Sequence, residues 1–297
     1  MITPAEWQSR KRAIVNGYAT PSDWRGLLQM LSVFAPLAAL WWVVRQGAHR
    51  SPWIAVAATL LLSLFLLRGF VLMHDCGHNS LFRSRSLNRI GGFLLGVLAG
   101  MPQPVWAENH RYHHTTNGNW AKYRGPLNVA CVSDYLAMDA GQRRRYRYTR
   151  DILLSPVAGC LYFLVNPRVT WVRASVHLLR RRFARPDQPT PRDNAPSAAH
   201  YRHMTWNNVV LLTAWSLMAW AIGPWLFLAC YIVSGSLAGG YGIVLFTVQH
   251  NFEHAYASAD EGWDRDAAAL HGTSFLVLPR WLNWITADAA YHHVHHL

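Results

Sequence analysis

The sequence predicts an all-α integral membrane protein, with about four transmembrane helices in two hairpins, further re-entrant or interfacial helices, and a histidine-rich helical cap on the cytosolic side. Three observations predict this class. Hydrophobic residues make up 52% of the 297 and charged residues 14%, where a soluble domain carries about 25% charged residues. Four apolar runs are long enough to cross about 30 Å of hydrocarbon. Histidines gather directly after two of these runs and at the end of the chain.

The first predicted hairpin consists of Leu27 to Val44 and Pro52 to Met73, separated by a polar break at Arg45 to Ser51. Arg68 falls near the end of the second run, where a long basic side chain can reach the interface or pair with a partner. The second predicted hairpin consists of Val209 to Ile222, extended upstream from Met204, and of Trp225 to Val248 after a Gly-Pro turn.

Two weaker apolar runs, Ile90 to Val105 and Ile152 to Val165, are short and contain prolines. Runs of this length favour re-entrant or interfacial segments over full spans. The glycines of the last span, which include a GxxxG, favour close helix packing, with room for an acyl chain as the alternative.

The distribution of arginine predicts the orientation. The hairpin loops hold only Arg45 and Arg50, whereas the remaining segments between spans are rich in arginine. The positive-inside rule therefore places both termini and the middle segment in the cytoplasm, in what we expect to be a bacterial inner membrane. With four crossings, every histidine cluster reaches the same face. The net charge of +13 fits anionic lipid headgroups better than nucleic acid.

Cysteines and the N-terminus exclude other classes. The four cysteines are far apart without a CxxC pair, which disfavours zinc ribbons, thioredoxin-like sites and a disulfide framework. The N-terminus lacks the apolar core of a cleavable signal peptide.

Eleven of the sixteen histidines fall in four groups. Side chains three or four residues apart share a helix face, and each group has this spacing. The groups contain His74 and His78; His110, His113 and His114; His250 and His254; and His292, His293, His295 and His296.

Crowded imidazoles of this number predict a metal site, because protonated rings would repel one another and a metal keeps them neutral. Eight or nine ligands exceed the three or four of a zinc site, which indicates two metal ions. The ExxH pattern of soluble di-iron bundles is missing from the sequence. Carboxylates that can orient the ligands from outside are Asp75, Glu108, Glu253 and Asp288.

The segments HDCGH (74–78), HRYHH (110–114), VQHNFEH (248–254) and AYHHVHHL (290–297) resemble those of the membrane fatty-acid desaturases, closest to the acyl-lipid type. The resemblance covers nearly the whole chain, which we take as a single domain, residues 1–297. It implies iron ligands at His74, His78, His110, His113, His114, His292, His295 and His296, with a ninth from His250 or His254. His293 fits the pattern poorly.

The sequence departs from the family in one respect. Family members usually continue past the last histidine group with a cytosolic tail, whereas this chain ends at Leu297. We expect either that the sequence is cut short just after this group or that the metal orders the terminus.

The resemblance implies that two iron ions and O₂ remove two hydrogens from the acyl chain of a membrane lipid to form a double bond. The sequence has no nucleotide fingerprint and no iron–sulfur spacing, so electrons must come from a separate protein, for which ferredoxin is the natural candidate. The arginines from 143 to 150 can bind such a donor or anionic lipid, and we favour lipid.

Two other functions remain open at this point. A membrane hydroxylase or ketolase acting on an alkane, sterol or carotenoid would use the same histidine scaffold. A metal transporter or haem protein is disfavoured, because its polar residues should lie within the spans, whereas these histidines follow them.

Overall fold

The structure is a computed structural model that describes residues 4–123, 130–183 and 196–297. The regular elements in these ranges are helices, beside two isolated β-bridges. In chain order they are α1 (Pro4–Tyr18), α2 (Asp23–Gly47), α3 (Pro52–Gly77), α4 (Arg85–Leu98), α5 (Gln103–Thr116), α6 (Val132–Ala137), α7 (Ala140–Tyr148), η1 (Ile152–Leu154), α8 (Ser155–Gly159), η2 (Cys160–Val165, a π-helix), α9 (Asn166–Phe183), α10 (Ala198–Ile222), α11 (Pro224–His250), α12 (Arg265–His271), α13 (Arg280–Ile285) and α14 (His292–His295).

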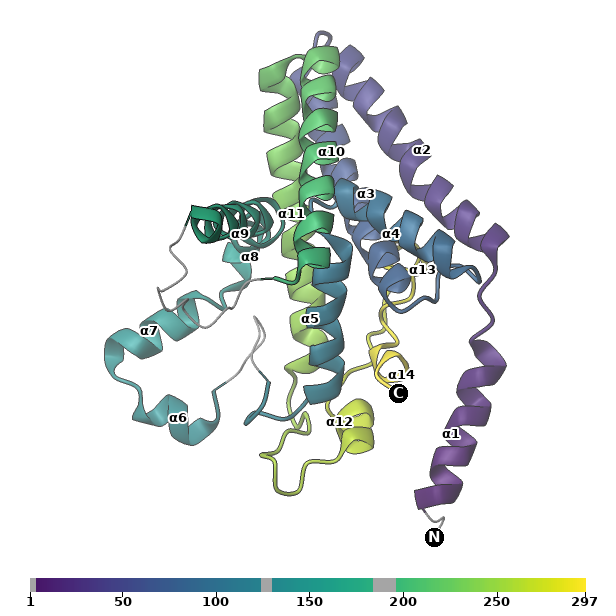
Figure 1. Ribbon diagram of the computed structural model, residues 1–297, viewed down its shortest axis with the longest axis vertical. Helices are drawn as coiled ribbons and strands as arrows, with labels where there is room; N and C mark the ends of the chain where they lie inside the picture. Colours follow the sequence, from purple (N-terminus) through teal and green to yellow (C-terminus); the bar gives the residue numbers. More distant parts are fainter. Residues whose placement is uncertain (1–3, 124–129, 184–195) are drawn as a thin grey trace.

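Two helical hairpins form the apolar half of the molecule. Helices α2 and α3 are joined by a short turn before Pro52, and α10 and α11 meet at Gly223, whose φ of 104° lies in the region that favours glycine. Figure 1 shows both turns at the top of the molecule. The predicted pairing of the apolar runs into two hairpins is therefore confirmed.

Four described helical segments are long and apolar enough to cross a membrane: Asp23–Gly47, Pro52–Gly77, Ile152–Arg180 and Pro224–His250. The predicted number of about four membrane-spanning helices is confirmed, but one of the four segments differs from those predicted. The short run at 152–165 favoured a re-entrant or interfacial segment, whereas the helical segment continues beyond Val165 to Arg180 and reaches 29 residues, which is long enough to cross.

The expected span at 204–222 lies within α10, which is not among these four. Asn207 and Asn208 stand in its first half and lower its apolar character. In Figure 1 α9 is seen nearly end-on beside α10 and α11, which run up the page, so the later part of the 152–180 segment lies at a steep angle to the second hairpin.

Helices α4 and α5 form a bent pair with an angle of 100° between them. The bend is tight at Gly96, where an added Cβ would lie 2.6 Å from the carbonyl oxygen of Met101. This geometry agrees with the prediction that 90–105 does not form a straight span. It also aims α5 away from the hairpin turns, toward the end of the molecule that carries α12 and α14 (Figure 1).

The glycines of α11 allow another helix to approach closely. A Cβ added to Gly239 would lie 2.6 Å from the Cα of Gly159 at the end of α8, and one added to Gly240 would lie 2.9 Å from the nitrogen of Pro156. Contacts this short are possible only without side chains. Close packing, the favoured interpretation of these glycines, is what the structure shows.

Arg68 is 1% exposed and joins three helices. Its guanidinium donates hydrogen bonds to the side chains of Gln29 and Ser32 on α2 and to the carbonyl oxygen of Trp284 on α13. It also lies 3.9 Å from the centroid of the Trp284 ring. Each of the three nitrogens of the buried guanidinium therefore donates a hydrogen bond, which offsets the cost of burying the charge and links α13 to the first hairpin.

Candidate metal centre

A first group of histidines lies where α3, α5 and α14 meet. His74 and His78 come from the end of α3, His110 and His114 from α5, and His295 from α14. One ring nitrogen of each lies within 4.8 Å of the corresponding atom of every other member. The Nε2 atoms of His74 and His295 are 3.0 Å apart, so two segments separated by more than 200 residues meet here.

A second group lies beside the first and is more buried. It consists of His113 of α5, His250 at the end of α11, and His292 and His296 at the C-terminus, again within 4.8 Å. The Nε2 atom of His250 lies 3.1 Å from that of His113 and 2.8 Å from that of His292. Within the HxxHH segment of α5, His110 and His114 therefore belong to the first group and His113 to the second.

The spacing of these nitrogens fits ligands around a metal ion. Imidazole nitrogens bind such metals at about 2.0–2.1 Å, so two ligands at right angles around one ion stand about 3.0 Å apart. Five Nε2–Nε2 contacts within the two groups have separations of 2.8 to 3.2 Å. Each group can therefore hold a metal ion.

Burial keeps the C-terminal rings neutral. The pKa values of His292, His295 and His296 are all well below the usual range, first because burial penalises the charged imidazolium and then because neighbouring histidines repel it. A neutral imidazole presents the lone pair that a metal needs. The site is therefore ready to bind a cation near neutral pH.

The comparisons with known proteins agree with this geometry. The sequence model of the family "Fatty acid desaturase" matches residues 51–297. The chain belongs to this family. A fatty acid desaturase of Bacillus subtilis (strain 168) is 33% identical over 99% of this chain and 78% of the relative.

For desaturases of lower sequence identity, the match to this chain covers a smaller share of the relative's length. An sn-1 oleoyl-lipid 12-desaturase of Anabaena variabilis is 22% identical over 83% of this chain, which spans 65% of that relative. A chloroplastic omega-6 fatty acid desaturase of Spinacia oleracea is also 22% identical, and the chain spans 51% of it. The resemblance found in the histidine motifs is confirmed, and the chain is an enzyme of the desaturase class.

One candidate ligand of this desaturase lies outside both groups. His254 has an almost fully exposed side chain, 3.7 Å from the carboxylate of Glu253, which is equally exposed. The helix α11 ends at His250, and the chain then turns away, so the expected i, i+4 pair never shares a helix face. His293, which fits the motif poorly, also belongs to neither group.

The predicted outer carboxylates occupy different places. Asp75 lies 2.9 Å from Nδ1 of His74 and can orient that ring. Glu108 pairs instead with His200 at 3.2 Å. Among the described contacts, neither Glu253 nor Asp288 forms a hydrogen bond to a histidine of the two groups.

Aromatic rings that the motifs do not include line the desaturase site. Trp106 stacks on His110 with ring centroids 4.6 Å apart, and Phe246 lies 5.0 Å from His113 and 5.2 Å from His250. Each aromatic residue lies four residues before a histidine of its own helix. This helical spacing is the sequence feature from which both contacts could have been predicted.

Two cavities lie near this centre. An apolar cavity of about 20 Å³ between α3, α4, η2 and α11 includes Phe70 in its lining, and Phe70 packs edge-on against Trp106. A larger polar pocket of about 220 Å³ is lined by His78, His110 and His114 together with Arg111 and Arg265.

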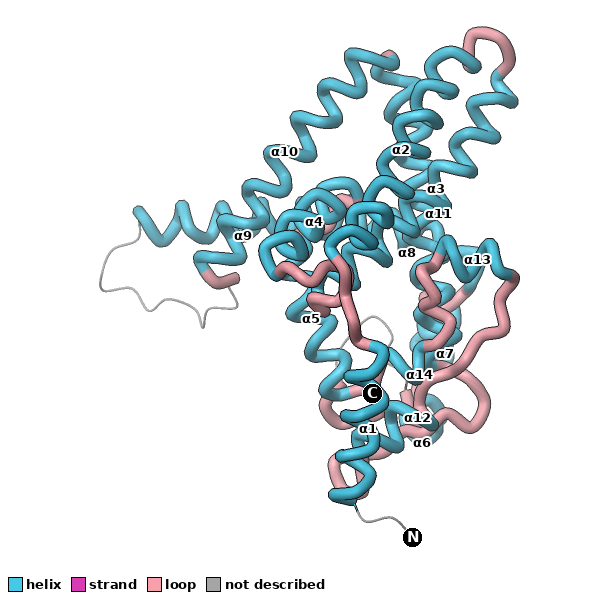
Figure 2. The backbone as a smooth tube through the Cα atoms, turned by 90° about the vertical axis from the view of Figure 1, so that its right-hand side faces the viewer, coloured by secondary structure: helices cyan, strands magenta, loops and turns pink. Residues whose placement is uncertain are grey.

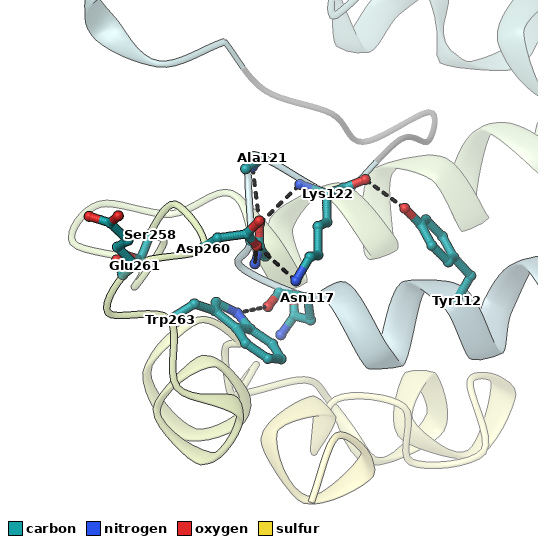
Figure 3. A network of polar contacts seen from close by, with 9 residues as sticks. Tyr112, Asn117, Ala121, Lys122, Ser258, Asp260, Glu261 and Trp263 are labelled. Carbon is teal, nitrogen blue, oxygen red and sulfur yellow. Dashed lines mark hydrogen bonds and ion pairs between the residues drawn. The ribbon is translucent and has the colours of Figure 1, made fainter.

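A hydrogen-bond network attaches the loop before α12 to the end of α5 (Figure 3). Trp263 donates from its indole to the carbonyl oxygen of Asn117, and Asp260 accepts from Asn119 and pairs with Lys122 at 2.9 Å. Tyr112 of α5 donates to the carbonyl oxygen of Lys122. Helix α12 is therefore held against the segment that carries the second histidine motif.

Proposed function

We propose that this chain catalyses O₂-dependent desaturation of a fatty acyl chain on a membrane lipid, using two iron ions held by its histidines. The observation that carries the proposal is the convergence of nine histidines, from four separate segments, into two adjacent groups. Membership of the desaturase family supplies the reaction.

In this proposal the ligands divide five to four. His74, His78, His110, His114 and His295 hold one iron, and His113, His250, His292 and His296 hold the other. His250 is then the ninth ligand and His254 has no metal role. Asp75 acts by orienting His74.

The reaction requires an oxidant made from O₂, because the C–H bonds of an acyl chain resist acid–base chemistry, and iron bound at this site supplies that chemistry. Overall, a –CH₂–CH₂– unit, O₂, two electrons and two protons give –CH=CH– and two molecules of water. The substrate loses two hydrogens and two electrons, and O₂ is reduced by four electrons in total. The aromatic rings of Trp106 and Phe246 pack directly against His110 and His113, and we expect them to limit the space for water on that side of the histidines.

The acyl chain is proposed to approach from the apolar side, along the seam where Phe70 and Trp106 separate the small cavity from His74 and His110. That cavity must widen to admit a chain. The relatives named as acting on oleoyl-lipid support a lipid-linked substrate.

The histidines are proposed to face the cytoplasm, with ferredoxin as the electron donor. The side that carries them lies opposite both hairpin turns (Figure 1), and the arginine-poor turns are expected outside. A cysteine introduced into the 48–51 turn should react with a membrane-impermeant maleimide added to intact cells. Labelling only after lysis would reverse the orientation.

The reaction is tested by the acyl composition of total lipids from a host that produces the chain, beside a His113→Ala variant present at the same level. We expect new unsaturation that disappears in the variant. Products that carry added oxygen instead would assign the chain to hydroxylation and contradict the proposal.

A further inference from the structure

Helix α14 carries candidate metal ligands but cannot fix its own position. It consists of the four residues His292–His295 and supplies His292 and His295, with His296 directly after it. A single helical turn gains too few hydrogen bonds to be stable alone. The three rings are therefore held in place by the segments that pack against α14.

Helix α12 is one of these segments, and it lies beside members of both histidine groups. It packs against α14. Its first residue, Arg265, lines the polar pocket together with His78 and His114 of the first group. Its inner face is buried, because Ala268 and Ala269 are only 1–2% exposed. A displacement of α12 would therefore disturb the positions of the histidines.

One attachment of α12 comes from the end of α5. Asn117 donates from its side-chain amide to the carbonyl oxygen of Ala268 at 2.9 Å, and its own carbonyl oxygen accepts from the indole of Trp263 at 2.8 Å. The network of Figure 3 continues this attachment along the loop before α12. It joins α12 to the helix that carries the second histidine motif.

A second attachment of α12 comes from α1. Trp7, Gln8 and Lys11 donate to the carboxylate of Asp266 at 2.7, 2.7 and 2.6 Å; we call these four residues the Asp266 contact. Trp7 and Lys11 lie one helical turn apart and are half-buried, whereas the other side chains of residues 6–18 are exposed. Both views show α1 at the end of the molecule that carries α12 and α14 (Figures 1 and 2).

The Asp266 contact differs from an ordinary surface ion pair, which adds little to stability. The side chains of Lys11 and Asp266 are only 13% and 20% exposed. The hydrogen bond from Lys11 is the main cause that lowers the pKa of the Asp266 carboxyl below its usual range. The carboxylate is therefore ionised at neutral pH and accepts strong, charge-assisted hydrogen bonds. Because α1 continues through residues 19–22 into α2, the contact also joins α12 to the first hairpin.

We propose that Asp266 is a positioning residue for the metal centre: held by α1, it fixes α12, and through α12 it holds the histidines of α14. The inference rests on the proposed two-iron site. Asp266 belongs to neither histidine group, so it acts through α12 and not as a ligand. Helix α1 precedes the residues 51–297 that the family model matches, so the contact involves a part of this chain outside the matched segment.

The test reverses the charge at two neighbouring positions of α1. Lys11→Glu places a carboxylate against Asp266, whereas Arg12→Glu makes the same change of charge at an exposed position. Full-length proteins purified in detergent and loaded with iron are titrated with a competing chelator. We expect Lys11→Glu to weaken iron binding about tenfold, the lower end of the effect of residues that orient ligands. Arg12→Glu should match the parent chain.

Two further measurements separate positioning from a general loss of stability. The double variant Lys11→Glu, Asp266→Lys restores opposite charges across the contact and should regain most of the lost iron affinity. In the metal-free protein, amide hydrogen exchange should become faster in α12 and α14 of Lys11→Glu. Exchange in α3 and α11 should stay as in the parent, because only the local structure is released.

Three results would overturn the positioning role while the parent chain binds iron. Unchanged iron affinity in Lys11→Glu would show that the contact does not reach the metal centre. An equal loss in Arg12→Glu would make the effect one of general charge. A double variant no better than Lys11→Glu would show that the pairing itself is unimportant. A parent chain that binds no iron would instead contradict the proposed two-iron site, and this inference with it.

Discussion

At the scale of single residues, His250 and His254 show how much depends on where a helix ends. Their spacing would place both on one face of a helix, yet α11 stops at His250 and His254 takes a φ of +65° in an exposed turn. His250 lies within 3.1 Å of two other histidines, whereas His254 contacts Glu253.

This pair supplies a matched test of the ligand set. His250→Ala should lower bound iron to one ion or fewer per chain and abolish desaturation, because it removes one of only four ligands in the second group. His254→Ala should retain both iron ions and full activity. Elemental analysis of the purified proteins, together with product analysis, measures both. Loss of iron from His254→Ala would place the ninth ligand elsewhere.

Asp75 gives a milder prediction at the same scale. Its carboxylate lies 2.9 Å from Nδ1 of His74 and orients that ring. Asp75→Asn should weaken binding of iron to the first group by roughly 10–100-fold, the usual cost of removing an outer partner of a ligating histidine. A competition titration with a chelator measures this affinity. Glu253→Gln is the control, and an equal loss there would contradict a specific role for Asp75.

At the scale of elements, the hairpins, the bent α4–α5 pair and the close packing of α11 followed from apolar length, proline and glycine. The length of the helical segment at 152–180 did not follow from these features. The continuation of the 152–165 run into α9 depends on residues that carry arginines, so composition alone ended the element too early. The division of the α5 histidines between two groups also needs the positions of α11 and α14, which no local pattern contains.

Because α8 and α11 pack closely, one added methyl group should affect stability very differently at Gly159 and at Gly242. Gly159→Ala should destabilise the protein by about 1–3 kcal/mol, because the new Cβ would lie 2.6 Å from the backbone of Gly239. Gly242→Ala adds the same group to α11 at 3.7 Å from Leu67, an ordinary contact, and should be nearly neutral. Thermal unfolding in detergent measures the difference, and equal Tm values would contradict the close packing.

At the scale of the whole molecule, stability is linked to pH through the buried histidines. His292, His295 and His296 have pKa values well below the usual range because burial penalises their charged form, whereas in the unfolded chain they titrate near about 6.5. Above that pH both states are neutral. Below it the unfolded chain binds protons that the folded chain does not, so stability falls as pH falls.

The metal-free protein should therefore lose Tm steadily between pH 7 and pH 5. Intrinsic tryptophan fluorescence during heating in detergent measures the loss. A His292→Gln, His295→Gln double variant should show a shallower dependence, since it removes two of the linked groups. A pH-independent Tm in the parent chain would contradict the burial of these rings in the folded state.

Nine histidines from four distant segments are proposed to form one site for two iron ions. The most direct measurement is the iron content per chain of the protein purified after production with added iron, for the parent chain and for His292→Ala beside His293→Ala. We predict two iron ions in the parent, two in His293→Ala and at most one in His292→Ala. Fewer than one iron in the parent, or identical iron content in the two variants, would contradict a two-iron site at these histidines.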